Sequence, residues 1–265
     1  MSGRPEPARD AVDDRCRGYV TISVDDGHPS DIKTADLLRQ LGFRATFYVP
    51  ATNHDQPILT KSQLRLLAED FEVGSHTFSH VALPTLPLDR ARQEIADGKR
   101  WLEDVLGAPV RSFCYPLGRF NRRIVRLVAE AGFDGARTTM NHIVDWPADP
   151  FTCATTTQAF SHSRTVSVRH AARERNWRGL VNYGRIFHAA VPWTQHFDVA
   201  AGYVARHGGV VHLWLHSWEL DETRQWDQFV RALRQVRDHH RLTPATNHAV
   251  FRRSQAPIAA IRNTD

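Results

Sequence analysis

The sequence predicts an α/β fold in which helices pack around a parallel sheet or barrel. From residue 19 to residue 138, short β-rich runs alternate with segments of helical pattern, as in βαβ units. Gly42, Gly107 and Gly132 each end a helical pattern directly before a strand-like run, as a glycine after a helix C-terminus does. The 265 residues contain no internal repeat and no low-complexity linker, so we expect a single domain.

The elements follow from the chain in order. Runs such as YVTISV, RATFYVP and VVHLWLH are rich in β-branched and aromatic residues and predict the strands 19–24, 44–50, 71–76, 110–116, 133–138 and 210–216. Helical patterns between and after them predict helices over 31–42, 60–70, 88–107, 121–132, 196–209 and 222–239. Residues 141–200 are rich in Thr, Pro and Trp and predict an insertion or an irregular part of the barrel, with one helix near 165–176.

The two ends of the chain differ from this pattern. Residues 1–17 are polar and contain prolines, so we expect a flexible N-terminal arm. The barrel domain is expected over residues 18–250 and a C-terminal tail over 251–265.

Composition excludes several classes of protein. The net charge is +5, but the basic residues are dispersed and no nucleic-acid-binding motif occurs, so no nucleic-acid partner is expected. No apolar run reaches the ~20 residues of a membrane span, and no signal-peptide core occurs. The three cysteines, Cys16, Cys114 and Cys153, form no CxxC pair and predict free thiols. We therefore expect a cytoplasmic protein that does not span a membrane.

Polar residues follow the expected strands at the points where these strands end. Asp25 and Asp26 follow the first strand, His76 and His80 follow the third, the segment YPLGRFN follows the fourth, and His216 ends the run VVHLWLH. In a parallel sheet or barrel, the carboxyl ends of the strands meet at one face, where active sites are built. These residues are therefore the candidates for a shared site.

The segment HTFSH carries a pattern suited to metal binding. His76 and His80 are four residues apart, so on one helical turn both imidazoles would project from the same face. With one carboxylate of the Asp25-Asp26 pair they would form a His₂Asp set with positions left open for water and substrate. Such a set suits a divalent metal, foremost Zn²⁺, with Co²⁺ or Ni²⁺ as alternatives.

Five segments in this order resemble the motifs of the polysaccharide deacetylase family, also called carbohydrate esterase family four or the nodulation-factor deacetylase homology domain. They are TISVDDG, RATFYVP, EVGSHTFSH, FCYPLGRFN and HLWLH, and the resemblance runs from about residue 19 to residue 219. It implies a distorted parallel (β/α)₇-type barrel. It also implies metal-dependent hydrolysis of an amide.

The resemblance assigns roles to the residues that match the motifs. Asp25 resembles the general base, and Asp26, His76 and His80 resemble the metal triad. His216 resembles the general acid that protonates the leaving amine. A carboxylate must then keep the His216 ring charged near neutral pH.

Other residues are implied around the substrate. The backbone N–H of Leu117, in the motif that contains Tyr115, is expected to hold the oxyanion, and Leu215 is expected to form a wall of the acyl pocket. Asp145 and Trp146 lie about where the family carries an acid paired with the catalytic histidine and a tryptophan lining the pocket.

Two assignments stay open on the sequence. Asp145 could be a turn residue instead, and Glu219, three residues beyond His216, is a rival partner for the histidine. The family's third motif often carries an arginine that holds the catalytic aspartate, but Cys114 stands at this place, so Arg137 on the neighbouring strand is a candidate to orient Asp25.

The expected function is removal of an N-acyl group, typically acetyl, from an amino sugar in a soluble, lipid-linked or nucleotide-linked saccharide. Arg169 and Arg173, one helical turn apart, could meet a phosphate on such a substrate, although a solvated basic helix face is the favoured explanation. A family relative that hydrolyses a non-sugar amide or ureide is one alternative. A non-catalytic carbohydrate-binding module is the other, and the full set of site residues argues against it. The oligomeric state is not predicted.

Overall fold

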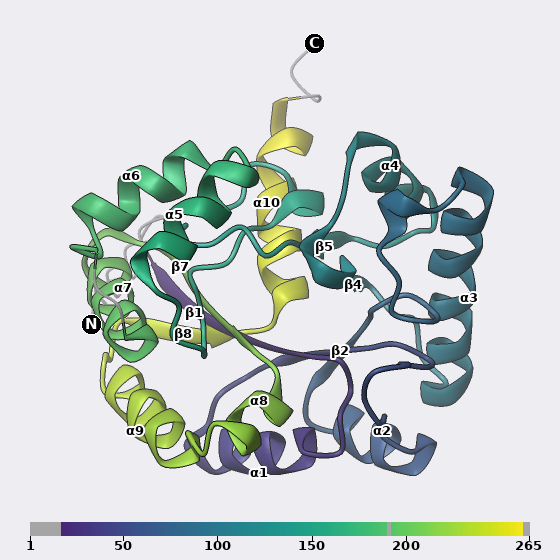
Figure 1. Cartoon of the computed structure of the whole chain (residues 1–265), viewed down its shortest axis with the longest axis horizontal. Helices are drawn as coiled ribbons and strands as arrows, with labels where there is room; N and C mark the ends of the chain where they lie inside the picture. Colours follow the sequence, from purple (N-terminus) through teal and green to yellow (C-terminus); the bar gives the residue numbers. More distant parts are fainter. Residues whose placement is uncertain (1–16, 190–191, 262–265) are drawn as a thin grey trace, which may run out of the picture.

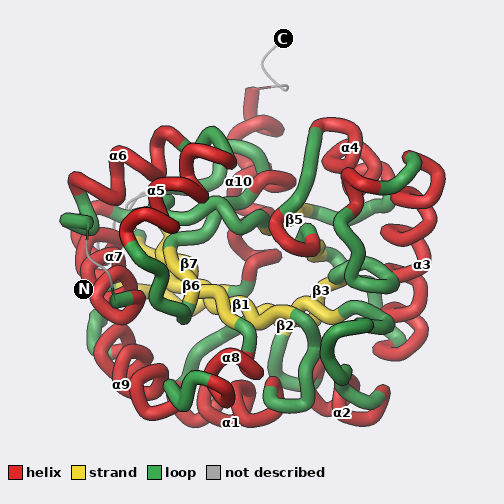
Figure 2. The backbone as a smooth tube through the Cα atoms, viewed as in Figure 1, coloured by secondary structure: helices red, strands yellow, loops and turns green. Residues whose placement is uncertain are grey.

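In the computed structural model, which describes residues 17–189 and 192–261, eight strands form one parallel sheet that curls into a partial barrel (Figures 1 and 2). This architecture confirms the predicted distorted barrel. The expected N-terminal arm, apart from residue 17, and Cys16 lie outside the described residues. The strands are β1 (Gly18–Asp25), β2 (Thr46–Val49), β3 (Glu72–Ser75), β4 (Ser112–Cys114), β5 (Gly135–Arg137), β6 (Thr157–Gln158), β7 (Gly209–Leu215) and β8 (Leu242–Ala245).

The strand order β5-β4-β3-β2-β1-β7-β6 places β1 at the centre of the sheet. β7 pairs with β1 along its length, from Gly18 beside Gly209 to Val24 beside Leu215. On the other side, the first half of β1 pairs with β8 and the second half with β2. Because β1 is buried at all eight positions, its carboxyl end delivers Asp25 into the middle of the molecule.

The helices surround the sheet as an outer ring (Figure 2). Left-handed glycines after α1 and α3, Gly42 with φ 74° and Gly107 with φ 68°, end these helices where the sequence predicted. The helices are α1 (Asp31–Leu41), α2 (Lys61–Ala68), α3 (Leu88–Leu106), α4 (Arg122–Glu130), α5 (Arg164–Arg173), α6 (Trp177–Arg185), α7 (Trp193–His207), α8 (Ser217–Glu222), α9 (Trp226–Arg237) and α10 (Asn247–Ile261), with short 3₁₀ turns η2 (Leu83–Thr85), η3 (Pro116–Gly118) and η4 (Pro150–Thr152).

Residues 141–200 are more regular than the sequence indicated. The helix expected near 165–176 is α5, and a second helix, α6, follows it after Arg175, which lies in the left-handed region with φ 54°. The segment also contributes β6, which pairs with β7, and an isolated bridge between Arg137 and Cys153. These contacts link the two edges of the curled sheet, so the segment is part of the barrel as well as an insertion.

The amino-terminal end of the barrel is covered by α10, which crosses the domain boundary expected at residue 250. Phe251 is fully buried in a second apolar cluster with Tyr19, Val210 and Val250. The expected tail therefore begins inside a packed helix. Among the described residues, none of the helices is long and apolar enough to span a membrane.

Candidate active site

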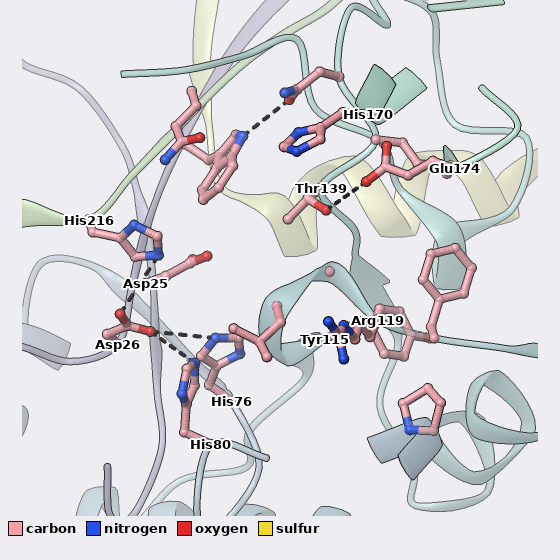
Figure 3. Close-up of a pocket in the computed structure, with 18 of the residues that line it drawn as sticks. Asp25, Asp26, His76, His80, Tyr115, Arg119, Thr139, His170, Glu174 and His216 are labelled. Atoms are coloured by element: carbon pink, nitrogen blue, oxygen red, sulfur yellow. Dashed lines mark hydrogen bonds and ion pairs between the residues drawn. The ribbon is translucent and has the colours of Figure 1, made fainter. Parts of the chain in front are cut away.

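A cavity of about 1030 Å³ opens at the carboxyl ends of the strands (Figure 3). The strand ends deliver most of the predicted residues into it: Asp25 and Asp26 from β1, His76 and His80 after β3, Tyr115 and Leu117 after β4, and His216 after β7. Gly27, with φ 65°, turns the chain behind the two aspartates, where a Cβ atom would lie 2.6 Å from Cγ1 of Val49.

Asp26, His76 and His80 converge as a possible set of metal ligands, with one ligand atom of each lying within 4.8 Å of the others. Oδ1 of Asp26 is 3.1 Å from Nε2 of His80 and 3.8 Å from Nε2 of His76. Burial alone would raise the pKa of Asp26, but the neighbouring histidines, foremost His80, hold it below its usual range.

The chemistry of these atoms fits a cation. Nδ1 of His76 lies 2.8 Å from the Cys114 carbonyl oxygen, which can only accept, so Nδ1 carries the proton. Burial, reinforced by His80, lowers the pKa of His76 to about 4, so the ring is neutral at pH 7 and Nε2 presents a lone pair. This lone pair faces Oδ1 of Asp26, a buried oxygen that accepts no hydrogen bond from the described residues. A divalent metal would satisfy both acceptors.

The local conformation of HTFSH differs from the predicted helical turn. The segment after β3 is a loop in which Thr77 and His80 adopt left-handed backbone angles, with φ 68° and 54°. The two imidazoles still come together, with ring centroids 4.9 Å apart. Asp26, with φ 80°, is left-handed as well, so two of the three candidate ligands have strained backbone angles.

Arg137 lies beside Asp25, as the sequence suggested. Its Nη2 contacts both carboxylate oxygens of Asp25, and both side chains are buried. The guanidinium carbon lies 5.4 Å from the ring centroid of Tyr48 and 5.2 Å from that of Trp214. Burial opposes the charge on Arg137, but Asp25 raises its pKa, so the guanidinium stays charged.

Cys114 belongs to a second group that could in principle hold a metal, together with Asp25 and His76. This group fits a metal less well, because Nδ1 of His76 is engaged by the Cys114 carbonyl and Asp25 by Arg137. Burial also raises the pKa of the Cys114 thiol well above its usual value, which disfavours the thiolate that metals bind. Cys114 and Cys153 are both free, as expected.

His216 is paired with Glu219 rather than with Asp145. Nδ1 of His216 lies 3.1 Å from Oε2 of Glu219, and Nε2 lies 3.7 Å from Oδ2 of Asp26. Burial alone would lower the pKa of His216, but Glu219 and the two aspartates raise it to about 9. Nε2 of Gln158 donates to Glu219 at 3.0 Å and so holds the carboxylate in place.

Asp145 and Trp146 were predicted near the site, and the structure places them elsewhere. Asp145 is half-exposed and forms an ion pair with Arg178 at 2.9 Å. Trp146 packs edge-on against Tyr19, with ring centroids 5.2 Å apart, in the cluster covered by α10. Because Tyr19 lies at the start of β1, these residues are at the opposite end of the barrel from the cavity.

The predictions for the acyl pocket are partly met. Leu117 lines the cavity in a left-handed conformation with φ 56°, and its N–H has no hydrogen-bond partner among the described residues. Tyr115 lines it as well and donates from its hydroxyl to the Phe151 carbonyl at 3.0 Å. Leu215 does not line it, because its side chain points into the apolar core beside β1.

Trp218 has a role that the sequence did not reveal. Its indole N–H donates to Oδ2 of Asp26 at 3.1 Å, and its ring stacks on His216 at a centroid distance of 5.3 Å. Its position two residues beyond His216 was the available signal, but a hydrogen bond to β1 could not be inferred from spacing along one segment.

Comparisons with known proteins point to one family. Residues 13–136 match the polysaccharide deacetylase family model. The chain is 30% identical over 135 residues to the peptidoglycan-N-acetylglucosamine deacetylase of Bacillus cereus, which covers 49% of this chain and 58% of that protein. It is 27% identical over 123 residues to YxkH of Bacillus subtilis, and this match covers 45% of this chain and 44% of that protein. The chain thus spans about half the length of the curated relatives it matches.

The fold is similar to that of a solved structure. The family 4 carbohydrate esterase from Streptomyces lividans, solved in complex with acetate, aligns over 87% of this chain and 93% of its own, with a TM-score of 0.53 and 18% identity. The residues that match the family model, 13–136, include the strand-end aspartates and both histidines of the candidate triad. The family-model match over residues 13–136 and these relatives support assignment of the chain to the polysaccharide deacetylase family.

Proposed function

We propose that the protein is a metal-dependent hydrolase that removes the N-acetyl group from an N-acetylated amino sugar. The observation that carries the proposal is the convergence of Asp26, His76 and His80 beside Asp25 and His216 in one cavity. The name of the Bacillus cereus relative supports an N-acetylated sugar as substrate.

Asp26, His76 and His80 would hold one divalent metal ion, such as Zn²⁺, which when bound supplies Lewis-acid activation of water and of the amide carbonyl. The chain's own residues supply the remaining groups. The Leu117 N–H is free to donate to the carbonyl oxygen as it gains negative charge.

Asp25 serves as the general base. Its carboxylate is 3% exposed and is held by Arg137, so it is fixed in orientation before substrate arrives. It accepts one proton from the water that attacks the acetyl carbon. The C–N bond then breaks, with the acetyl group leaving as acetate and the nitrogen as an amine.

His216 serves as the general acid. Against the effect of burial, Glu219 raises the pKa of His216, which favours the imidazolium that donates its proton to the leaving nitrogen. Glu219, which lies 3.1 Å from Nδ1, orients the ring so that Nε2 faces the cavity.

The test is acetate release from N-acetylated saccharides by the zinc-loaded protein. Wild type should release acetate, and His216→Gln should lower kcat by about 10²–10⁴-fold without changing the bound metal. The matched control is His240→Gln, because His240 is an exposed histidine outside the cavity and should leave kcat unchanged. A zinc-loaded wild type that releases acetate from none of these saccharides, or a His216→Gln variant with normal kcat, would contradict the proposal.

A second prediction concerns Trp218. Trp218→Phe keeps a ring that can stack on His216 but removes the N–H that donates to Asp26. Loss of such a bond to a metal ligand typically weakens metal binding, so we expect a zinc Kd about 10- to 100-fold higher, measured by chelator competition. Trp214→Phe is the matched control, since the Trp214 indole donates to Asn141 at 3.2 Å and not to a ligand. Equal zinc affinity in wild type and Trp218→Phe would show that the Trp218 N–H does not support metal binding.

A further inference from the structure

Three arginines that the proposed reaction does not use line the same cavity. Arg119 follows η3, and Arg173 and Arg175 lie at the end of α5 and in the turn before α6. All three are exposed, and their guanidinium groups form no ion pair or hydrogen bond with any residue in the described part of the chain. The cavity therefore presents three guanidinium groups without an ion-pair partner among the described residues, although the charge of Arg173 acts on the neighbouring Glu174.

Arginines on the outer surface vary in this respect. Arg39 pairs with Asp36 and Asp70, and Arg92 pairs with Glu130, each at 2.7 to 2.8 Å. Others, such as Arg122, form no ion pair with the described residues, so what distinguishes the three arginines is that they gather in one cavity. Groups that stay unpaired in a cavity remain available to a ligand.

The arginine-bearing wall lies across the cavity from the reacting groups. Figure 3 shows Arg119, His170 and Glu174 on one side of the cavity and Asp26 and His216 on the other. A saccharide whose acetamido group reached Asp26 would therefore extend towards these arginines.

Little negative charge opposes the arginines on this wall. Glu174 accepts a hydrogen bond from the Thr139 hydroxyl at 3.2 Å, and burial raises its pKa. Asp55 also lines the cavity, but it comes from the loop between β2 and α2. The arginines are therefore only weakly compensated within the protein.

We propose that Arg119, Arg173 and Arg175 form a phosphate subsite, so that the substrate is an N-acetylated saccharide carrying a phosphate or diphosphate group. This proposal rests on the proposed deacetylase function. One sugar carboxylate has too few acceptor oxygens for three guanidinium groups. A phosphate or diphosphate offers several acceptor oxygens and about two negative charges. The group could belong to a sugar phosphate, a nucleotide sugar or a lipid diphosphate.

Arg169 provides the matched control. It is exposed on α5 one turn before Arg173, but it does not line the cavity. Of the two arginines that the sequence suggested for a phosphate, the structure thus brings only Arg173 to the cavity. Arg169→Gln removes the same charge from the same helix without changing the proposed subsite.

The experiment compares zinc-loaded wild type, Arg173→Gln/Arg175→Gln and Arg169→Gln on four substrates. Two phosphorylated substrates, N-acetylglucosamine 1-phosphate and UDP-N-acetylglucosamine, and a polyprenyl-diphosphate-linked N-acetylglucosamine distinguish the sources of the phosphate. Neutral N-acetylchitopentaose is the reference. For the best phosphorylated substrate we expect the double variant to raise KM about 10-fold or more at unchanged kcat, with Arg169→Gln like wild type. Deacetylation of the neutral substrate should be equal in all three proteins.

A binding measurement separates this proposal from the deacetylase function. The affinity of the metal-free protein for UDP-N-acetylglucosamine and the polyprenyl diphosphate is measured by calorimetry, and the double variant should bind the preferred one about 10-fold more weakly. Arginine-dependent binding without any deacetylation would refute the deacetylase function and retain the subsite. Wild-type preference for the neutral substrate, or equal binding by wild type and the double variant, would overturn the subsite and leave the deacetylase function standing.

Discussion

Replacing Arg137 with methionine is expected to lower the free energy of unfolding by about 3–5 kcal/mol, because it leaves Asp25 as an unpaired buried charge. Arg137 is fully buried, and Asp25 is its ion-pair partner. Its Nε and Nη1 have no hydrogen-bond partner among the described residues, so the stabilising contacts are Asp25 and the rings of Tyr48 and Trp214. Turnover should also fall about 100-fold, since Asp25 loses the group that orients it.

The double variant Arg137→Met/Asp25→Asn separates these two effects. It removes both charges, so urea unfolding should show most of the lost stability restored, while acetate release stays at background. Asp25→Asn alone completes the double-mutant cycle. A single variant Arg137→Met with wild-type stability and turnover would show that the pair neither stabilises the fold nor orients the base.

The fold could be predicted from the sequence because it depends on local patterns. The first five strands and four helices alternate regularly, and glycines such as Gly42 and Gly107 mark helix ends in the chain itself. β6 and β8 lacked such signals: β6 has two residues, and β8 contains Pro244. Their place in the sheet is set by tertiary pairing with β7 and β1, which no local pattern encodes.

The site could be predicted as far as strand ends determine it. Asp25, Asp26, His76, His80 and His216 meet because parallel strands deliver their carboxyl ends to one face. The pairing of Arg137 with Asp25 also follows from strand order: Arg137 is the register partner of Cys114 on the neighbouring strand, so a long side chain there can reach the same space.

The two misplaced residues of segment 141–200 share one physical origin. Asp145 and Trp146 were assigned by approximate spacing in a segment whose path was unknown, and that path leads to the amino-terminal end of the barrel. The position of Glu219 does not depend on the path of a long segment, because Glu219 lies in the first turn of α8 only three residues beyond His216. A residue close in sequence to a known site residue can occupy only a few positions around it. A residue within a long irregular segment is not restricted in this way.

His80→Ala should abolish both zinc binding and acetate release. Removing His80 leaves two candidate ligands, Asp26 and His76, where a catalytic site uses three protein ligands. After dialysis with excess zinc, wild type should retain about one metal ion per chain and His80→Ala close to none. Added zinc at 100 times its Kd should stabilise wild type by about 2.7 kcal/mol and should not stabilise the variant.

Asp25→Asn is the control that distinguishes metal loss from loss of the base. This variant keeps Asp26, His76 and His80, so it should bind zinc and gain stability from it, yet lose about 10²–10⁴-fold in turnover. Zinc retained by His80→Ala would mean that the metal lies elsewhere, as in the set of Asp25, His76 and Cys114. Zinc lost from Asp25→Asn would point to the same second set. The two adjacent carboxylates at the end of β1 thus predict opposite results: Asp26 is needed for the metal to bind, and Asp25 is needed only once the metal and the substrate are in place.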